Sequence, residues 1–218
     1  MLASFKIVCV GVYEKMKKNK GKTLIIGVDE AGRGPLAGPI AVGAAVLFVP
    51  PNNISFWHRV RDSKKLSPGE REVLFKEIKG AKKKGLLDYR VSMVSHTVID
   101  TKGLTYAARL GVKRALKNLD IAKGAQVLLD GSLYAPKEYK QRTITGGDDK
   151  YKIIGLASIV AKVKRDRRMK NISKKYLGYG FEVHAGYGTK GHYQAIQKNG
   201  ISLIHRRSFL KQLTGKKK

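Results

Sequence analysis

Three carboxylates stand at positions where a strand would end. Because they share the same chemistry and the same kind of position, they could act together. Asp29 and Glu30 follow the apolar stretch from Thr23 to Val28, and Asp130 follows the stretch from Ala125 to Leu129. Carboxylates at the C-terminal ends of strands point into the crevice where α/β proteins place their ligands. Buried in a strand interior, they would be costly without a partner. Grouped acids of this kind suit hard divalent cations, which prefer oxygen ligands.

A fourth acid, Asp166, lies in a helix that the sequence predicts from Ile153 to about Met169. The apolar residues Ile159 and Val163 precede it at helical spacing, so we expect its side chain to face inward. Two interpretations follow. Asp166 forms a salt bridge with the adjacent arginines at positions 165, 167 and 168, or it converges with the other three acids on metal ions. Spacing alone leaves both open.

The glycine-rich segment from Gly32 to Gly38 differs from the known phosphate-binding loops. No Lys-Ser or Lys-Thr pair follows it, its third glycine comes one residue late for G-x-G-x-x-G, and Pro39 prevents a regular helix there. It is either a tight hairpin turn or a backbone that a nucleic-acid strand can approach closely, with N–H groups free to donate.

The last quarter of the chain carries three histidines, His184, His192 and His205, without the H-E-x-x-H spacing of a zinc site. We expect them to be surface or hydrogen-bonded structural residues. Five aromatic residues interleave there with lysines and glycines: Tyr176, Tyr179, Phe181, Tyr187 and Tyr193. Most should pack in the interior, and one could stack on a base or sugar.

The elements that would position these residues follow from the hydrophobic pattern. Strands are predicted at 23–28 and 40–49, which should pair as a hairpin, and at 89–94 and 125–129. A helix should begin at Pro68, behind a capping box of Ser67 and Glu70, and end at Gly80. Further helices are predicted at 104–119, at 153–169 and from about 190. The expected fold is an α/β layer with a mixed sheet and a C-terminal helical region.

Composition narrows the functional class. The 218 residues carry 45 Lys and Arg against 16 Asp and Glu, a formal net charge of +29. Such an excess favours a polyanionic partner, nucleic acid first and an anionic membrane surface second. The single cysteine, Cys9, excludes an internal disulfide framework and a cysteine-based zinc site, and it fits a reducing cytoplasm. We expect residues 1–22 to be a basic, poorly ordered extension rather than a signal peptide, and we expect no membrane span.

Read together, these motifs resemble a known family. The segment from Gly27 to Pro39 (GVDEAGRGPLAGP) closely resembles the opening signature of type 2 ribonucleases H, the ribonuclease HII family. Further blocks of that family follow in the family's order, and together they cover about residues 23 to 210: Asp62–Ser67, Leu129–Gly131, Gly147–Lys162, Arg165–Arg167, His184–His192 and His205–Phe209.

The resemblance implies roles for particular residues. It assigns the four metal-binding carboxylates to Asp29, Glu30, Asp130 and Asp166. The backbone of Gly32, Arg33 and Gly34 would sense the 2′-OH of a ribonucleotide, and Tyr187 would stack on the sugar next to the scissile junction. Lys64 and Lys65, in the DSKKLS block, would also contact the substrate.

The resemblance further implies a ribonuclease H-like mixed sheet flanked by helices over residues 23–170, with a C-terminal helical region and basic tail over 171–218. The expected activity is endonucleolytic cleavage of RNA in RNA–DNA hybrids and at single ribonucleotides in duplex DNA. Two Mg²⁺ or Mn²⁺ ions would support hydrolysis that leaves 5′-phosphate and 3′-hydroxyl ends. We expect a cytoplasmic monomer.

Departures from the family pattern spare the four acids. They are Gly103, Ser132, Gly155-Leu156 and Ala185. A non-catalytic basic nucleic-acid-binding protein would explain the charge but leave the acids unexplained. Ribonuclease HIII usually carries an extra N-terminal platform domain, which the roughly 22 residues before Thr23 would not form, so the resemblance favours the HII type.

Overall fold

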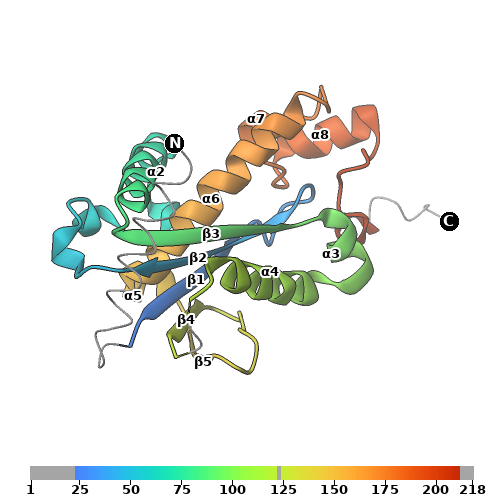
Figure 1. The fold of residues 1–218 in the computed structure, drawn as a ribbon. Coiled ribbons are helices and arrows are strands. Elements are labelled where there is room, and N and C mark those ends of the chain that lie inside the picture. Colours follow the sequence, from blue (N-terminus) through green and yellow to red (C-terminus); the bar gives the residue numbers. More distant parts are fainter. Residues whose placement is uncertain (1–22, 122–123, 212–218) are drawn as a thin grey trace, which may run out of the picture.

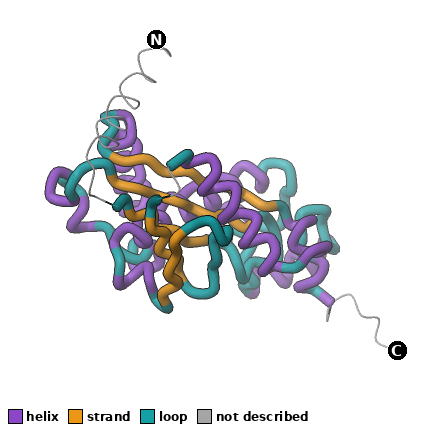
Figure 2. Tube along the Cα trace, turned by 60° about the horizontal axis from the view of Figure 1, so that its bottom comes forward, coloured by secondary structure: helices purple, strands orange, loops and turns teal. Residues whose placement is uncertain are grey.

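A computed structural model describes residues 23–121 and 124–211, which build a five-stranded mixed sheet with helices on both faces (Figure 1). The predicted basic extension at 1–22 lies outside the described residues, as do the end of the predicted tail and Cys9. Figure 2 shows the strands running through the middle of the molecule, with helices to either side.

The central strand of the sheet carries the first two predicted acids. Strand order is β3-β2-β1-β4-β5, with β1 at Ile25–Ala31, β2 at Ile40–Leu47, β3 at Leu87–Val94, β4 at Gln126–Asp130 and β5 at Lys140–Ile144. β1, β2 and β3 pair antiparallel, whereas β4 runs parallel to β1 and to β5. The predicted hairpin and the predicted mixed sheet are both confirmed.

One face of the sheet is covered by α6 (Lys152–Ser173), together with α2 (Pro68–Lys83). Glycines in the sheet let α6 approach the strands closely. A Cβ added to Gly27 would stand 2.2 Å from the carbonyl oxygen of Ile153, and one added to Gly43 would stand 2.4 Å from that of Ala157. The helix therefore lies almost on the backbone of β1 and β2, beside the acids.

The opposite face is covered by α4 (Leu104–Leu119), whose bounds match the prediction. Its buried residues include Ala108, Val112 and Ala115, which follow one another at helical spacing and so form one face of the helix. They pack on a core of aliphatic side chains from the sheet.

Helix α2 begins as predicted, since both hydrogen bonds of the Ser67–Glu70 capping box are present. It does not end at Gly80, however, but continues to Lys83. Ala81 is buried in the last turn, and Gly85, with φ of +71°, follows the end of the helix. Burial of this turn outweighs the cost of about 1 kcal/mol for one glycine in a helix.

Several short elements complete the chain. They are α3 (His96–Lys102), α5 (Gly147–Lys150), α7 (Phe181–His184), α8 (Lys190–Asn199), and 3-10 turns at Pro51–Asn53, Trp57–Arg59, Ser63–Lys65 and Arg207–Phe209. The predicted helix near residue 190 corresponds to α8. The end of α6 packs against the C-terminal region through Met169, Ile172, Phe181 and Ile204. The division of the chain at residue 170 stays a prediction, because α6 runs through it.

Among the described residues, no helix is long and apolar enough to cross a membrane.

Candidate metal centre

Three carboxylates meet beside the inner strands β1 and β4: Asp29 of β1, Asp130 at the end of β4 and Asp148 of α5. One oxygen of each lies within 4.8 Å of the others. Asp29 and Asp130 were predicted to converge, and the structure brings them together. Asp148 was not singled out. Three acids at this spacing can hold a divalent cation, which prefers oxygen ligands.

The parallel pairing of β1 with β4 explains why the first two acids are neighbours. Val28 is in register with Leu129, so the residue that follows each of them falls at the same level of the sheet. The amide of Gly147 then donates a hydrogen bond of 2.6 Å to Oδ1 of Asp130. This contact holds the start of α5 against the end of β4 and places Asp148 beside the other two.

The electrostatics of the cluster are unfavourable without a counter-charge. Burial, with added repulsion from Glu30 and Asp130, raises the pKa of Asp29 well above its usual range. Burial also raises the pKa of Asp148, as do the negative charges of Asp130 and Asp62. Buried like charges of this kind become favourable when a cation compensates them.

Glu30 lies at the border of the cluster and has an unsatisfied atom. Its Oε2 is buried and accepts no hydrogen bond from the described residues, while Oε1 lies 3.4 Å from Nη1 of Arg33. Burial raises the pKa of Glu30, and Asp130 adds to that shift. A buried carboxylate oxygen without a partner is costly in an apolar setting, and a metal ion would satisfy it. This observation shows that the residues present fit a metal.

Asp166 lies elsewhere. Its carboxylate is 3.0 Å from Nζ of Lys162, one turn earlier on α6, and about a third of the side chain is exposed. The structure does not include it in the carboxylate group within 4.8 Å. An ion pair was one of the two interpretations for Asp166, although the partner is a lysine rather than an arginine. Its role as a metal ligand stays a prediction.

The signal for Asp148 was present in the sequence. It belongs to the Gly147–Lys162 block of the family resemblance, and it stands just before the long helix α6. Spacing did not reveal it, because its contact with β4 depends on the turn after β5.

Ser158 of α6 supports Asp29 and is itself in contact with Ser63. The hydroxyl of Ser158 hydrogen-bonds to Asp29, which favours its charged form, and lies 2.8 Å from the hydroxyl of Ser63. Through this contact the turn at Ser63–Lys65 is joined to the metal centre.

The same turn carries the two predicted lysines. Nζ of Lys64 lies 3.7 Å from Oδ2 of Asp148. Partial burial opposes its charge, but the surrounding carboxylates, Asp62 and Asp148 foremost, hold the pKa of Lys64 above its usual value. Lys65 instead pairs with Asp149 over 2.7 Å at the surface. The structure thus places Lys64 beside the metal-centre carboxylates, whereas Lys65 lies at the surface, paired with Asp149.

The predicted loop at Gly32–Gly34 directly follows β1 and contains no helix. Gly32 has φ of +93°, and a Cβ there would stand 2.0 Å from Nε of Arg165, so the position requires glycine. Further along this loop, the amide of Leu36 donates to the carbonyl of Gly186 over 2.8 Å. The loop and the segment carrying Tyr187 therefore lie side by side.

Tyr187 is 37% exposed. Nζ of Lys162 lies 5.2 Å from its ring centroid, and Cζ of Arg165 lies 5.5 Å away. Cations at this distance attract an aromatic face. The ring is thus supported by two basic side chains while part of it is open to solvent.

The three histidines lie together: the rings of His184 and His192 stack with their centroids 4.4 Å apart, and the ring of His205 is tilted against that of His192. Nε2 of His192 lies 3.0 Å from Nε2 of His205, and Nδ1 of His192 hydrogen-bonds to the carbonyl of Tyr187 over 2.9 Å. Burial lowers the pKa of His205 to about 4. His184 hydrogen-bonds to the carbonyl of Tyr179 and accepts from the amide of Gly186. These contacts fix the backbone on either side of Tyr187.

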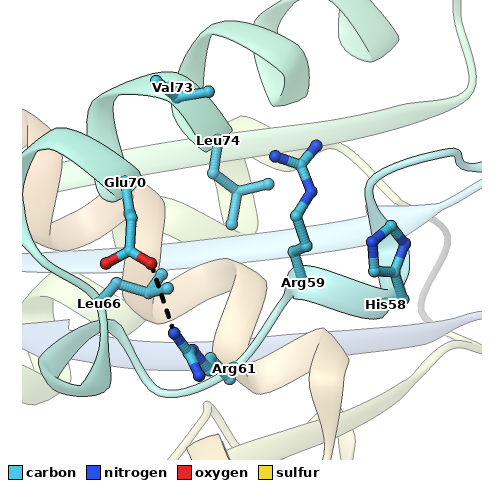
Figure 3. Close-up of a pocket in the computed structure, with 7 residues that line it drawn as sticks. All are labelled: His58, Arg59, Arg61, Leu66, Glu70, Val73 and Leu74. Atoms are coloured by element: carbon cyan, nitrogen blue, oxygen red, sulfur yellow. Dashed lines mark ion pairs between the residues drawn. The ribbon is translucent and has the colours of Figure 1, made fainter.

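A pocket of about 460 Å³ lies elsewhere, between α2 and the turn at Trp57–Arg59 (Figure 3). An ion pair of 3.5 Å joins Arg61 and Glu70 there. None of the predicted site residues lines it.

The sheet order and the acid cluster together define the class of protein: a metal-dependent nuclease with a ribonuclease H-like fold. The comparisons agree. The family model described as Ribonuclease HII matches residues 26–212. Ribonuclease HII of Caldicellulosiruptor bescii is 46% identical over 200 residues, which cover 92% of this chain and 93% of that protein. Ribonuclease HII of Clostridioides difficile is 41% identical over 204 residues, which cover 94% of this chain and 76% of that protein. The crystal structure of ribonuclease H2 from Pyrococcus horikoshii matches with a TM-score of 0.68 and 31% identity, covering 88% of this chain and 97% of that one.

The chain belongs to the ribonuclease HII family. It is accordingly a metal-dependent endoribonuclease that cleaves RNA in RNA–DNA hybrids.

Proposed function

We propose that the protein also cleaves at single ribonucleotides embedded in duplex DNA, using two divalent cations held by Asp29, Glu30, Asp130 and Asp148. The observation that carries the proposal is the buried group of three carboxylates, with the unsatisfied Oε2 of Glu30 at its border. We place Asp148 in this set in preference to Asp166, which is paired with Lys162.

Mg²⁺ and Mn²⁺ both match the all-oxygen donor set. When bound, the two ions would activate a water nucleophile and stabilise the departing 3′-oxygen, so that hydrolysis leaves 5′-phosphate and 3′-hydroxyl ends. The protein's own part is to hold the four carboxylates in position. Two of them are oriented by hydrogen bonds, Asp130 by the amide of Gly147 and Asp29 by the hydroxyl of Ser158.

Substrate contacts follow from the residues around the centre. Lys64 is close enough to the acids to meet a phosphate beside them. The amides of the Gly32–Gly34 loop would donate to the 2′-OH that distinguishes RNA from DNA. Tyr187, open on part of its ring, would stack on the adjoining sugar. Lys65 would contact the sugar-phosphate backbone of the substrate only after its ion pair with Asp149 is broken.

The net charge of +29 supports binding of a duplex through its phosphates, without reading of sequence. We propose that the enzyme acts as a monomer in the cytoplasm, a reducing compartment that suits a chain with a single cysteine.

A cleavage assay tests this function. The substrate is a duplex with one ribonucleotide, labelled at the 5′ end, and the matched control is the same duplex in DNA alone. We expect a single product ending 5′ of the ribonucleotide with Mg²⁺ or Mn²⁺, none with chelator, and none from the control. Cleavage that persists in chelator would disprove the metal assignment, and failure on the single ribonucleotide with retained hybrid cleavage would restrict the activity to hybrids.

A further inference from the structure

Arg206 is fully buried, yet it forms no ion pair with a carboxylate in the described part of the chain. All three of its guanidinium nitrogens donate instead to backbone carbonyls of the loop that follows β1. Nη2 donates to Gly32 over 2.7 Å, Nη1 to Arg33 over 2.7 Å and Nε to Gly38 over 3.0 Å. A buried charge is costly, and these bonds compensate for it.

The direction of these carbonyls determines where the next amides point. In a trans peptide unit, the C=O of one residue and the N–H of the following residue point in opposite directions. Because the carbonyls of Gly32 and Arg33 face Arg206, the amides of Arg33 and Gly34 face away from it. Gly34 is exposed, and a Cβ added there would meet nothing within 4 Å. Gly34 therefore leaves room for a ligand to approach the backbone of the loop.

We infer that Arg206 is a positioning residue for substrate recognition: by binding the carbonyls of Gly32 and Arg33, it holds the amides of Arg33 and Gly34 ready to donate to the 2′-OH of the ribonucleotide. The inference rests on the proposed function of this loop. Arg206 touches no substrate itself. Its planar guanidinium suits the task because it presents donors in a fixed geometry, which a lysine ammonium does not.

The neighbouring Arg165 secures the other half of the loop. It is also fully buried, and its nitrogens donate to the carbonyls of Ala37, Pro39 and Ala185. The two arginines therefore hold the loop together. Arg206 binds the carbonyls of both its start and Gly38, while Arg165 ties its end to the carbonyl of Ala185, before Tyr187.

The test compares Arg206→Lys with Arg207→Lys, the same conservative change at the next, exposed position. Two quantities are measured with Mg²⁺: kcat/KM for a duplex with one ribonucleotide, and the inhibition constant of the all-DNA duplex as competitor. For Arg206→Lys we expect kcat/KM to fall about tenfold or more, as for the loss of a well-oriented hydrogen bond, with the inhibition constant within about twofold. Arg207→Lys should leave both unchanged.

Equal weakening for both duplexes, in step with a lower melting temperature, would show that Arg206 is only a structural brace and overturn the inference. If the wild type itself shows no preference for the ribonucleotide duplex, the proposed function of the loop fails instead. Amide hydrogen exchange of the wild-type protein provides a test that needs no variant. The amides of Arg33 and Gly34 should exchange fast in the free protein, unlike those of Leu36 and Gly38, which donate to internal carbonyls. They should slow when the ribonucleotide duplex binds, and protection already in the free protein would contradict the inference.

Discussion

The amide of Gly147 donates a hydrogen bond of 2.6 Å to Oδ1 of Asp130, across 17 residues of chain. This bond joins the start of α5 to the end of β4. Because Asp148 is the next residue, the contact that orients one carboxylate also delivers another to the same place. The metal centre is thus assembled from two strands and a single turn of helix.

Replacing Asp148 separates the two candidates for the fourth ligand. Asp148→Asn should lower kcat on an RNA–DNA hybrid by on the order of 10²-fold or more, as for the loss of a metal ligand. Asp166→Asn should cost less than about tenfold, because it breaks a partly exposed ion pair with Lys162, which contributes little. Steady-state kinetics with saturating Mg²⁺ measure both. The reverse ranking would restore Asp166 as the ligand and remove Asp148.

Metal binding should be visible in thermal stability without any substrate. A cation that binds only the folded state stabilises it, by about 1.4 kcal/mol for each tenfold excess over its dissociation constant. For a chain of this size, that corresponds to a rise in Tm of roughly 3–5 °C. The wild type should show this rise with Mg²⁺ or Mn²⁺, and Asp130→Asn should not. An equal rise in both proteins would mean that the ions act elsewhere.

The raised pKa of Asp29 predicts a pH-dependent stability. An acid with a higher pKa in the folded state binds more protons when folded, so its favourable contribution is complete below the unfolded value of about 4 and is lost as pH rises through the folded pKa. Measured in chelator, the free energy of unfolding of the wild type should therefore fall relative to that of Asp29→Asn as pH rises above about 4. Because asparagine does not titrate, the difference between the two proteins reports the titration of Asp29 together with its coupling to Glu30 and Asp130. A difference that stays constant with pH would contradict the prediction.

The sequence alone predicted what depends on local pattern. The capping box at Ser67 and the bounds of α4 were correct, because each is decided by residues a few positions apart. Strand β5, with the sequence KQRTI, was missed because it has little apolar character and is formed by pairing with β4.

The candidate site shows the same limit. Asp29 and Asp130 could be expected together because each follows an apolar stretch predicted as a strand, although β1 in fact continues past Asp29 to Ala31. Asp166 was expected to face inward, but about a third of its side chain is exposed and it is not among the buried residues of α6, so helical spacing did not identify its partner Lys162. Asp148 reaches the centre through the bond from Gly147 to Asp130, which no spacing encodes.

The two outer glycines of the Gly32–Gly34 loop should respond differently to substitution. Gly34→Ala meets no atom within 4 Å in the free protein, so Tm should stay within about 1–2 °C of the wild type. The added methyl group would stand where a ribonucleotide approaches, and kcat/KM should fall. Gly32→Ala would clash with Arg165 at a φ of +93° and should lower Tm. Comparing thermal melts with kinetics for the two variants checks this, and an inactive but unfolded Gly34→Ala would contradict it.

Tyr187 offers a test of substrate specificity. Its ring is partly exposed and rests on Lys162 and Arg165, whereas its backbone is fixed independently by His184 and His192. Removing the ring in Tyr187→Ala should therefore leave the segment in place and lose roughly 1–3 kcal/mol of stacking at the junction sugar. A single ribonucleotide offers one such sugar, while a continuous hybrid offers many registers, so the single-ribonucleotide substrate should suffer more.

The measurement is the ratio of kcat/KM on the single-ribonucleotide duplex to that on the continuous hybrid, for wild type, Tyr187→Ala and Tyr187→Phe, together with Tm. Tyr187→Phe keeps the ring and should keep the ratio, which separates stacking from any contribution of the hydroxyl group. The ratio should drop for Tyr187→Ala with little change in Tm, since an exposed ring contributes little to the core. If both substrates lose activity equally and Tm falls, the ring is a structural element of the C-terminal region rather than a platform for the substrate.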